Sequence, residues 1–265
     1  MPELAEVEYY RKQWLPAIDQ CVINVHLNAE KRVFRGLDCA ALQSNLINEK
    51  FIEAEAHGKQ LCLRFGKSHW LGLHLGMTGK MYVSETGELP TKHEHLTIRM
   101  DSKLSLVFSD TRMFGRVLYF NNELPPQWWS LRPPEILSSE YSFERVDTYL
   151  NRRANSPIKA VLLVQKIFPG VGNWMADEIL WRSRILPDRQ CGKINFQDRK
   201  EIYRQILKVS KDAMDVIGAD WGKPPDNWLF NHRWKAGGYC PQTGSPLVRA
   251  KVGGRTSCWS PSWQR

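Results

Sequence analysis

The sequence predicts an α+β protein, with an opening helix and an antiparallel β-sandwich followed by a mostly helical region that ends in a β-hairpin. Three patterns indicate this class. Short apolar segments of alternating polarity follow one another up to residue 120, the apolar period becomes helical beyond residue 135, and paired glycines flank two apolar residues near the end of the chain. With 265 residues, 42% of them hydrophobic and 25% charged, the chain is long enough for one large or two modest domains.

Residues 1–125 are expected to form the first domain. Leu4, Val7, Trp14 and Ile18 lie on roughly one face of a helix. Strands this short and this regularly spaced after a helix indicate an antiparallel sandwich or barrel. The segments with alternating polarity are 22–27, 61–65, 70–75, 96–100, 104–108 and 116–120.

A linker is expected at residues 126–134, because Pro125-Pro126 and Pro133-Pro134 disfavour regular structure. Beyond this linker the apolar residues recur with a helical period, which predicts a helical domain over residues 135–225. The segments that carry this period are 143–151, 157–166, 173–182 and 196–217.

The last segment, residues 226–265, is expected to form a finger. Gly237-Gly238 and Gly253-Gly254 flank the apolar residues Leu247 and Val248. Glycine pairs between apolar residues are typical of tight hairpin turns. The sequence therefore predicts a β-hairpin here.

The charge distribution indicates a polyanionic partner. Lys and Arg number 37 against 28 Asp and Glu, which gives a net charge of +9. Residues 227–265 contain no acid, and their cations alternate with tryptophans, a composition suited to phosphates and stacked bases. A solvated basic tail is the alternative. The residues concerned are Arg233, Lys235, Arg249, Lys251, Arg255 and Arg265, with Trp228, Trp234, Trp259 and Trp263.

Neither export nor a membrane span is expected. The longest aliphatic run, 160–164, is far shorter than the ~20 residues of a membrane helix. The amino terminus carries acids where a secretory signal carries basic residues. The six cysteines form no C-x-x-C pair, so we expect reduced thiols without a disulfide framework. We expect a cytoplasmic, nucleoid-associated or nuclear protein that makes no membrane contact and is a monomer.

The amino terminus offers a nucleophile. An initiator Met before Pro is usually removed, which leaves Pro2 with a free secondary amine. Because α-amino groups have a pKa near ~8, a useful fraction of such an amine is unprotonated at neutral pH. Glu3 and Glu6 supply carboxyl groups for acid–base chemistry at a sugar C1′. Proline and acids are also typical of any helix start, and these residues alone favour that plainer interpretation.

Five motifs in one order shift this balance. Pro2-Glu3-Leu4-x-Glu6-Val7-Glu8 is followed by AHGKQL at 56–61, HLGMTG at 74–79, SDTRMFG at 109–115 and FPGVGN at 168–173. Together they resemble the formamidopyrimidine-DNA glycosylase / endonuclease VIII family over nearly the whole chain. The resemblance implies base-excision repair with an amino-terminal Pro as nucleophile. It also implies a helix-two-turn-helix fold for residues 135–225.

The resemblance implies that three side chains enter DNA. A base inside a duplex cannot be attacked at C1′, so the nucleotide must rotate out and its vacancy must be filled. Met77 and Phe114 are wedges of a suitable kind, and Arg112 can hydrogen-bond the orphaned partner base. Core packing is the alternative for Met77 and Phe114.

Phosphate contacts are also implied by the resemblance. Lys59, which we group with the catalytic residues, is implied to contact a phosphate near the lesion, and its alternative is a solvated strand position. Lys159 and Asn173 are implied to hold the phosphates around the rotated nucleotide, although Asn173 is also an ordinary helix cap. Arg255 lies in the finger at the position where, by the resemblance, an arginine binds a phosphate at the lesion.

The finger departs from the family, whose usual ending is a zinc site built from two C-x-x-C pairs. Only one thiolate of four remains here, and Cys258 is out of register to replace another. Structural zinc needs four ligands, so we expect a zincless finger and no cofactor of any kind. Packing of Val248, Trp259 and Trp263 is expected to take the place of the metal. The four ligand positions read Cys240, Thr243, Ser260 and Trp263.

These patterns predict a bifunctional DNA glycosylase and AP lyase that acts on damaged DNA. Pro2 would attack C1′, the modified base would leave with acid assistance from Glu3, and the Schiff base would decay by β- and δ-elimination. By the resemblance, members that excise 8-oxoguanine cover the purine with a long flexible loop, so the short segment 218–234 favours a modified pyrimidine or a ring-opened lesion over 8-oxoguanine. Coverage of the base by a different segment is the alternative. A non-catalytic lesion-binding protein of the same fold is the alternative. A nucleic-acid module of the translation machinery would not explain the wedge residues.

Overall fold

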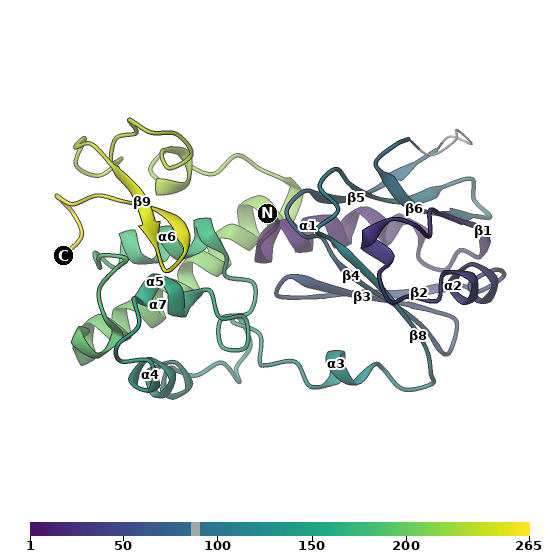
Figure 1. Ribbon diagram of the computed structural model, residues 1–265, viewed down its shortest axis with the longest axis horizontal. Coiled ribbons are helices and arrows are strands. Elements are labelled where there is room, and N and C mark those ends of the chain that lie inside the picture. Colours follow the sequence, from purple (N-terminus) through teal and green to yellow (C-terminus); the bar gives the residue numbers. More distant parts are fainter. Residues whose placement is uncertain (86–90) are drawn as a thin grey trace. The chain divides into compact units, whose positions relative to one another are not determined.

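The computed structural model describes residues 1–85 and 91–265, which form two compact units (Figure 1). Unit 1 consists of Met1–Pro2 and Glu6–Arg132, and unit 2 consists of Glu3–Ala5 and Pro133–Arg265. The division after Arg132 lies inside the segment expected to be a linker. Nothing in the sequence indicates that Glu3–Ala5 belong to unit 2.

Unit 1 is built on two four-stranded antiparallel sheets, which confirms the predicted β-sandwich. Each strand pairs antiparallel with its neighbours in the sheet, and successive side chains of each strand point to opposite faces because the strand is pleated. The first sheet has the order β1 (Val22–Leu27), β6 (Glu94–Met100), β7 (Ser105–Asp110), β5 (Gly79–Ser84). The second has the order β2 (Phe51–His57), β3 (Gln60–Phe65), β4 (His69–His74), β8 (Arg116–Asn121).

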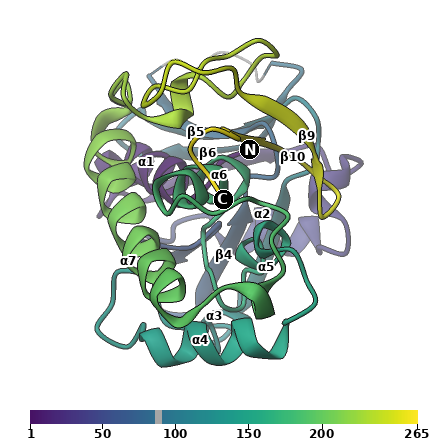
Figure 2. The same ribbon diagram turned by 90° about the vertical axis from the view of Figure 1, so that its left-hand side faces the viewer.

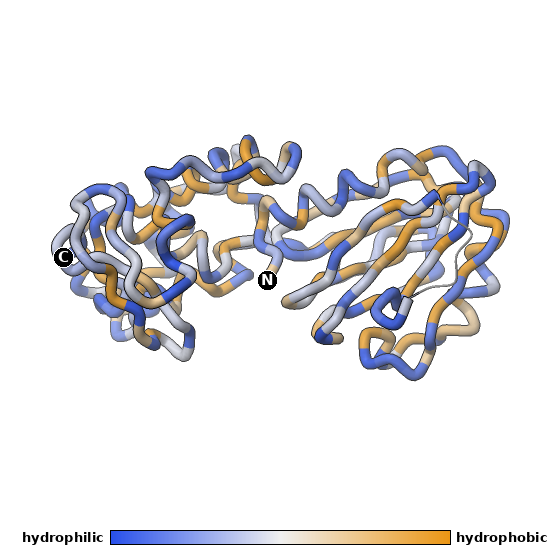
Figure 3. Tube along the Cα trace, turned by 90° about the horizontal axis from the view of Figure 1, so that it is seen from above, coloured by the Kyte–Doolittle hydropathy of each residue, from blue (hydrophilic) through white to orange (hydrophobic). Residues whose placement is uncertain are grey.

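Helix α1 (Leu4–Trp14) packs on the core of unit 1. Val7 and Trp14 are fully buried, and the indole Nε1 of Trp14 donates to the carbonyl oxygen of Tyr82 at 3.1 Å. Phe51 and Phe65 stack in the same core with their ring centres 4.8 Å apart. Figure 3 shows the apolar stretches that run along α1 and the strands.

Four elements of unit 1 differ from the prediction. β2 and β5 were not expected, because Ala, Glu, Gly and Lys are depleted in strands; their sheet neighbours supply the hydrogen bonds that hold them. α2 (Cys39–Asn45) was not expected either, although Asp38 caps it. α3 (Gln127–Ser130) lies within the predicted linker, where buried Trp129 donates to Glu55 at 2.8 Å. Prolines therefore flank a short helix there and do not prevent it.

Unit 2 is mostly helical, as predicted. Its helices are α4 (Phe143–Arg152), α5 (Ile158–Leu162), α6 (Asn173–Arg182) and α7 (Phe196–Ala213), and a π-helical turn, Met214–Gly218, extends α7. α6 is buried from Trp174 to Trp181 and packs against α7 (Figure 2). The helix expected at 157–166 is shorter: it ends at Leu162, after which the chain tightens into a turn in which the Val164 N–H donates to the carbonyl oxygen of Val161. Short 3₁₀ helices occur at Leu15–Ala17, Arg32–Phe34, Cys191–Lys193 and Leu229–Asn231.

The predicted hairpin at the end of the chain is confirmed. β9 (Val248–Val252) and β10 (Arg255–Trp259) pair antiparallel around Gly253 and Gly254. Both glycines have positive φ, +57° and +80°, as a two-residue hairpin turn requires. β10 lies beside α6, so the hairpin is part of unit 2.

Two further observations concern the whole described chain. None of the helices in residues 1–85 and 91–265 combines the length and the apolar character needed to cross a bilayer. All six cysteines are free thiols, four of them buried, which agrees with the expected lack of a disulfide framework.

Candidate active site and nucleic-acid interface

Glu3 is anchored at the amino terminus of α6. The residue is 2% exposed, and its carboxylate accepts hydrogen bonds from the backbone N–H groups of Gly172 (2.8 Å), Trp174 (3.0 Å) and Met175 (3.1 Å). The first N–H groups of a helix have no partner within it, and the helix dipole favours an anion there. Glu3 therefore caps α6, and its three donors stabilise the ionised carboxylate.

The same anchor fixes the chain next to Pro2. The Leu4 N–H donates to the carbonyl oxygen of Gly170 at 3.1 Å. A side-chain carbon at Gly172 would lie 2.2 Å from Cδ of Glu3, so glycine is needed for this close approach. Pro2 is thus bonded directly to a residue whose carboxylate is held against α6.

Glu6, the other predicted acid, lies within α1. It is 9% exposed and belongs to unit 1. Burial and the neighbouring Tyr9 and Glu6 raise the pKa of Tyr10 to about 12. Glu6 and Glu3 are therefore both shielded carboxylates within one helical turn of each other in the sequence.

Asp177 is a buried acceptor in the middle of α6. Its Oδ1 accepts from Nζ of Lys159 at 2.5 Å, and its Oδ2 accepts from Nη2 of Arg233 at 2.5 Å and the Cys258 N–H at 3.1 Å. Lys159 also donates to the carbonyl oxygen of Asn173 at 2.6 Å. One carboxylate therefore ties α5, the segment around Arg233 and β10 to α6.

The implied phosphate contact of Lys159 needs correction. The side chain of Lys159 is 0% exposed. Burial lowers the pKa of its ammonium, and Asp177 opposes that shift. A phosphate contact needs an ammonium at the surface, so Lys159 instead supports the backbone of Asn173.

Asn173 is the first residue of α6, and Arg255 is the first residue of β10, directly after the hairpin turn. Nδ2 of Asn173 donates to the carbonyl oxygen of Thr256 at 2.8 Å. Oδ1 of Asn173 is buried and has no hydrogen-bond partner among the described residues. Arg255 adjoins Thr256 and is exposed. The structure thus places the amide of Asn173 and the hairpin residues next to the exposed Arg255 at the amino-terminal end of α6.

The two predicted wedge residues of unit 1, Met77 and Phe114, and the predicted base contact, Arg112, are exposed. Met77 is 40% exposed and Phe114 is 43% exposed, which excludes core packing for both. The guanidinium of Arg112 lies 4.9 Å from the centre of the Phe114 ring. A side-chain carbon at Gly76 would lie 2.5 Å from the backbone of Phe114, so the two loops touch directly. The structure therefore brings the three side chains to neighbouring loops.

Asp110 holds these two loops together. It is 0% exposed, and its Oδ1 accepts from the Thr78 hydroxyl at 2.6 Å and from the Arg112 N–H at 3.2 Å. Its Oδ2 accepts from the Gly115 N–H at 2.7 Å. A single buried carboxylate thus fixes the backbone on both sides of Phe114.

Lys59 belongs to the same unit. It sits in the tight turn between β2 and β3, after Gly58 with its φ of +59°, and is half-buried. Burial, followed by the charges of Lys59 and Arg35, lowers the pKa of His74. Lys59 is therefore close enough to influence the residue that precedes the Met77 turn.

The finger contains a hydrogen-bonded cluster where the family has its zinc ligands. Sγ of Cys240 accepts from Nε1 of Trp181 at 3.4 Å. The hydroxyl of Ser262 lies 3.2 Å from that of Thr243 and 3.1 Å from that of Ser260. Burial raises the pKa of Cys240, but hydrogen bonds from Thr243, Ser260 and Trp181 lower it to about 7. One thiol among neutral hydroxyls does not fit zinc.

Packing around this cluster differs in part from the prediction. Trp263 packs with Trp181, Leu229 and the two cysteines, Cys240 and Cys258, as a small apolar core. Val248 is 37% exposed, so its expected packing role is wrong. Leu247, the residue before it, packs on the core instead, because neighbouring residues of an extended chain face opposite sides.

We expect purified protein to contain no stoichiometric zinc, and a chelator to leave its melting temperature unchanged. A structural zinc contributes ~10–16 kcal/mol in zinc-finger peptides, so removing one would have a large effect. Elemental analysis and calorimetry with and without chelator measure this. One equivalent of tightly held zinc would show that the ligand positions are misassigned.

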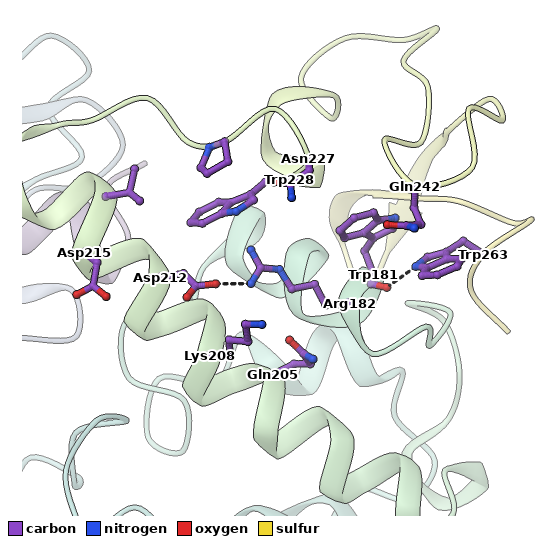
Figure 4. A pocket seen from close by; sticks show the side chains of 12 residues that line it. Trp181, Arg182, Gln205, Lys208, Asp212, Asp215, Asn227, Trp228, Gln242 and Trp263 are labelled. Atoms are coloured by element: carbon purple, nitrogen blue, oxygen red, sulfur yellow. Dashed lines mark hydrogen bonds and ion pairs between the residues drawn. The ribbon is translucent and has the colours of Figure 1, made fainter.

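A cavity of about 610 Å³ in unit 2 lies apart from these residues. α7, the end of α6, Trp228 and the finger line it (Figure 4). Arg182 projects into it, with its guanidinium 4.8 Å from the centre of the Trp228 ring and paired with Asp212 at 2.6 Å. No predicted site residue lines this cavity, so cavity volume does not locate the site.

Sequence reasoning missed Asp110, Asp177 and Arg233. Asp177 follows Asn173 by four residues, so both lie on one helix face, and this spacing was the available signal. Asp110 lies inside the motif that carries Arg112 but was not singled out. Arg233 was counted only as a basic residue, and nothing in the sequence indicates that it is buried.

Two family models match the chain. The formamidopyrimidine-DNA glycosylase N-terminal domain matches residues 1–117, and the formamidopyrimidine-DNA glycosylase H2TH domain matches residues 133–221. A formamidopyrimidine-DNA glycosylase of Geotalea daltonii is 30% identical over 275 residues, which cover all of both chains.

Solved structures of Fpg proteins are also similar to the chain over nearly its whole length. Lactococcus lactis Fpg bound to DNA with an abasic site is 25% identical, with a TM-score of 0.87 over 99% of each chain. The wild-type protein of that species bound to DNA with an oxidised pyrimidine is also 25% identical, with a TM-score of 0.87 over 100% of each chain. On this evidence, the chain belongs to the formamidopyrimidine-DNA glycosylase family.

Proposed function

We propose that this protein is a DNA N-glycosylase and AP lyase of base-excision repair. One observation carries the proposal: Pro2 is bonded to Glu3, whose carboxylate is fixed by three N–H groups of α6. The carboxylate caps α6, and the same contacts hold the residue next to the proposed nucleophile in one position. A relative named formamidopyrimidine-DNA glycosylase, and similar Fpg structures bound to abasic or oxidised-pyrimidine DNA, support the glycosylase part of the proposal.

In the proposed reaction the amine of Pro2, freed by removal of Met1, attacks C1′ of the damaged nucleotide. The C1′–N bond breaks, and the base leaves with its electron pair and takes up one proton. The C1′–O4′ bond then breaks, with the proton of the Pro2 amine passing to O4′, and an open-chain iminium remains. This iminium acidifies C2′, so loss of a C2′ proton expels the 3′ phosphate, and a second elimination expels the 5′ phosphate. These steps are nucleophilic catalysis followed by β- and δ-elimination.

Glu3 and Glu6 are the proposed carboxyl groups of this reaction. Three donors stabilise ionised Glu3, so this residue suits stabilisation of the cation that develops at C1′ and Pro2. To act as the acid that protonates the leaving base, Glu3 must first take up a proton against these donors. Proton transfer by such positioned groups contributes ~10²–10⁴-fold to rates.

The DNA grip is proposed to combine both units. Met77 and Phe114 would fill the vacancy of the rotated nucleotide, and Arg112 would contact its former partner. Arg255 and Lys59 would hold phosphates. Their exposed or half-buried positions support these roles, and we propose that one protein chain binds one site as a monomer.

Arg255→Ala and Lys59→Ala should each weaken DNA binding and reduce the slope of log affinity against log salt by about one unit. Each substitution removes one cationic phosphate contact, and each such contact releases about one counterion. Asn173→Ala should lower affinity with little change in slope, because the amide is uncharged. Titrations at several salt concentrations measure both quantities. Normal binding by Arg255→Ala at physiological salt would exclude the finger from the interface.

A modified pyrimidine is the proposed substrate. Residues 218–234, where a long loop would be needed to cover a purine, are held tightly: Nδ2 of Asn231 donates to the carbonyl oxygens of Pro224 and Pro225 at 3.0 and 2.8 Å. Trp228 in the same segment is buried. Little of this chain is available to fold over a large base.

A panel of duplexes with different lesions, scored for strand cutting, tests the proposal. We expect oxidised pyrimidines and abasic sites to be cut, and 8-oxoguanine to be removed at least several-fold more slowly in single-turnover reactions. Equal rates for 8-oxoguanine and oxidised pyrimidines would contradict the lesion preference. Tight binding of damaged DNA without any cutting would favour the non-catalytic lesion-binding protein instead.

A further inference from the structure

Gln165 is an exposed residue of unit 2 that lies three positions before the FPGVGN motif. Its side-chain Nε2 donates to the carbonyl oxygens of Leu163 at 2.9 Å and Val171 at 2.8 Å. Its Oε1 accepts from the Gly170 N–H at 3.1 Å. A side-chain amide offers two donor hydrogens and an acceptor oxygen, and here both of its ends bind backbone. The amide therefore joins the end of the loop 163–171 to its beginning.

The same loop holds the carboxylate of Glu3. The peptide group between Val171 and Gly172 accepts from Gln165 through its carbonyl oxygen. Its N–H, which belongs to Gly172, donates to Oε2 of Glu3 at 2.8 Å. Because a peptide group is planar, a hydrogen bond that fixes its carbonyl oxygen also fixes the direction of its N–H. Gln165 thereby sets the direction of one of the N–H groups that bind Glu3.

A second contact of the loop fixes the backbone of the next residue, Leu4. The carbonyl oxygen of Gly170 accepts from the Leu4 N–H at 3.1 Å, while the N–H of Gly170 is bound by Gln165. Gly170 has a φ of +86°, so the chain turns at this point. Gln165 thus binds the loop at both places from which it anchors the start of the chain, once at Gly170 and once at Val171.

We infer that Gln165 is a positioning residue for base excision, which acts by holding Glu3 and, through the peptide bond between them, Pro2. This inference rests on the proposed function, in which Pro2 attacks C1′ and Glu3 assists departure of the base. Gln165 needs no contact with DNA for this role. Because a displacement of about 1 Å at a reacting group can cost ~10²-fold in rate, loss of this support should slow the chemical step.

Gln165→Ala should excise the oxidised pyrimidine 5-hydroxyuracil roughly 5- to 50-fold more slowly in single-turnover reactions with protein in excess. Its affinity for a duplex with an uncleavable tetrahydrofuran site should stay within about twofold, because the variant removes no cation. The melting temperature should fall by no more than about 5 °C. The hydrogen bonds from the Phe168 and Val171 N–H groups, which shape the turn, remain in the variant.

Two further variants separate hydrogen bonding from the loss of a side chain. Gln165→Glu keeps the size and the acceptor but places an oxygen against the carbonyl oxygens of Leu163 and Val171, so it should be at least as slow as Gln165→Ala. Gln190→Ala is the matched control. Gln190 is also an exposed glutamine of unit 2, but its side chain makes no hydrogen bond to any residue in 1–85 or 91–265. We expect this control to excise 5-hydroxyuracil at the normal rate.

Normal excision by Gln165→Ala or by Gln165→Glu would overturn the inference. A loss that lies in duplex affinity would assign Gln165 to DNA binding, and a fall in melting temperature beyond about 5 °C would assign it to folding; either result also overturns the positioning role. Failure of the proposed function looks different, because the unaltered protein would then leave both 5-hydroxyuracil and abasic duplexes uncut.

Discussion

Asp177→Ala should lower the free energy of unfolding of unit 2 by ~3–5 kcal/mol, the usual cost of removing one partner from a buried ion pair. Asp177 accepts from Lys159 and Arg233 at 2.5 Å each and from the Cys258 N–H. Without the carboxylate, two buried cations would face each other without a counter-charge. Because Lys159 also holds Asn173, DNA binding should fall together with stability.

Calorimetry measures the effect as a fall in melting temperature of roughly 10 °C or more. Asp215→Ala is the matched control, since Asp215 pairs with Lys211 at 2.9 Å on the surface of the same unit, with both side chains at least 60% exposed. Exposed ion pairs contribute ~0–1 kcal/mol. Equal melting temperatures for the two variants would show that the buried network is not what holds unit 2 together.

Pro2→Gly should reduce base excision and strand cutting on the order of 10²-fold or more. A secondary amine forms an iminium that is cationic without taking up a proton, whereas the primary amine of glycine forms a neutral imine that must be protonated before elimination. The effect should lie in the chemical step, because the variant removes the reacting ring and no proposed phosphate contact.

Binding to a duplex with an uncleavable tetrahydrofuran site separates chemistry from DNA grip. We expect Pro2→Gly to bind it with normal affinity. Undiminished cutting by Pro2→Gly, measured as single-turnover rates on abasic DNA, would remove Pro2 from the mechanism.

Local patterns in the sequence predicted much of the fold. The glycine pair at 253–254 correctly marked the hairpin turn, because both positions need a positive φ. Glycines flanking the motifs of Met77 and Phe114 likewise placed these side chains on exposed turns. Each of these features depends on residues within a few positions of one another.

Contacts between residues far apart in the chain determine the features of the site that the sequence did not reveal. Glu3 meets partners about 170 positions later in the chain, and no local pattern encodes that contact. Lys159 seemed available for phosphate because its charge is visible in the sequence, but its burial against Asp177 is not. β2 is a different case: its strand partner β3 follows it directly in the chain, and β2 was missed because its Glu and Ala residues are depleted in strands.

Borohydride trapping on abasic DNA tests the central claim most directly. The reagent reduces a Schiff base to a stable amine, so protein and DNA that react through Pro2 become covalently joined. Peptide mapping of the adduct by mass spectrometry should place the DNA-derived mass on residue 2, with Met1 absent. An adduct on a lysine such as Lys59, or no adduct on abasic DNA that the protein cuts, would contradict the assignment of Pro2 as the nucleophile.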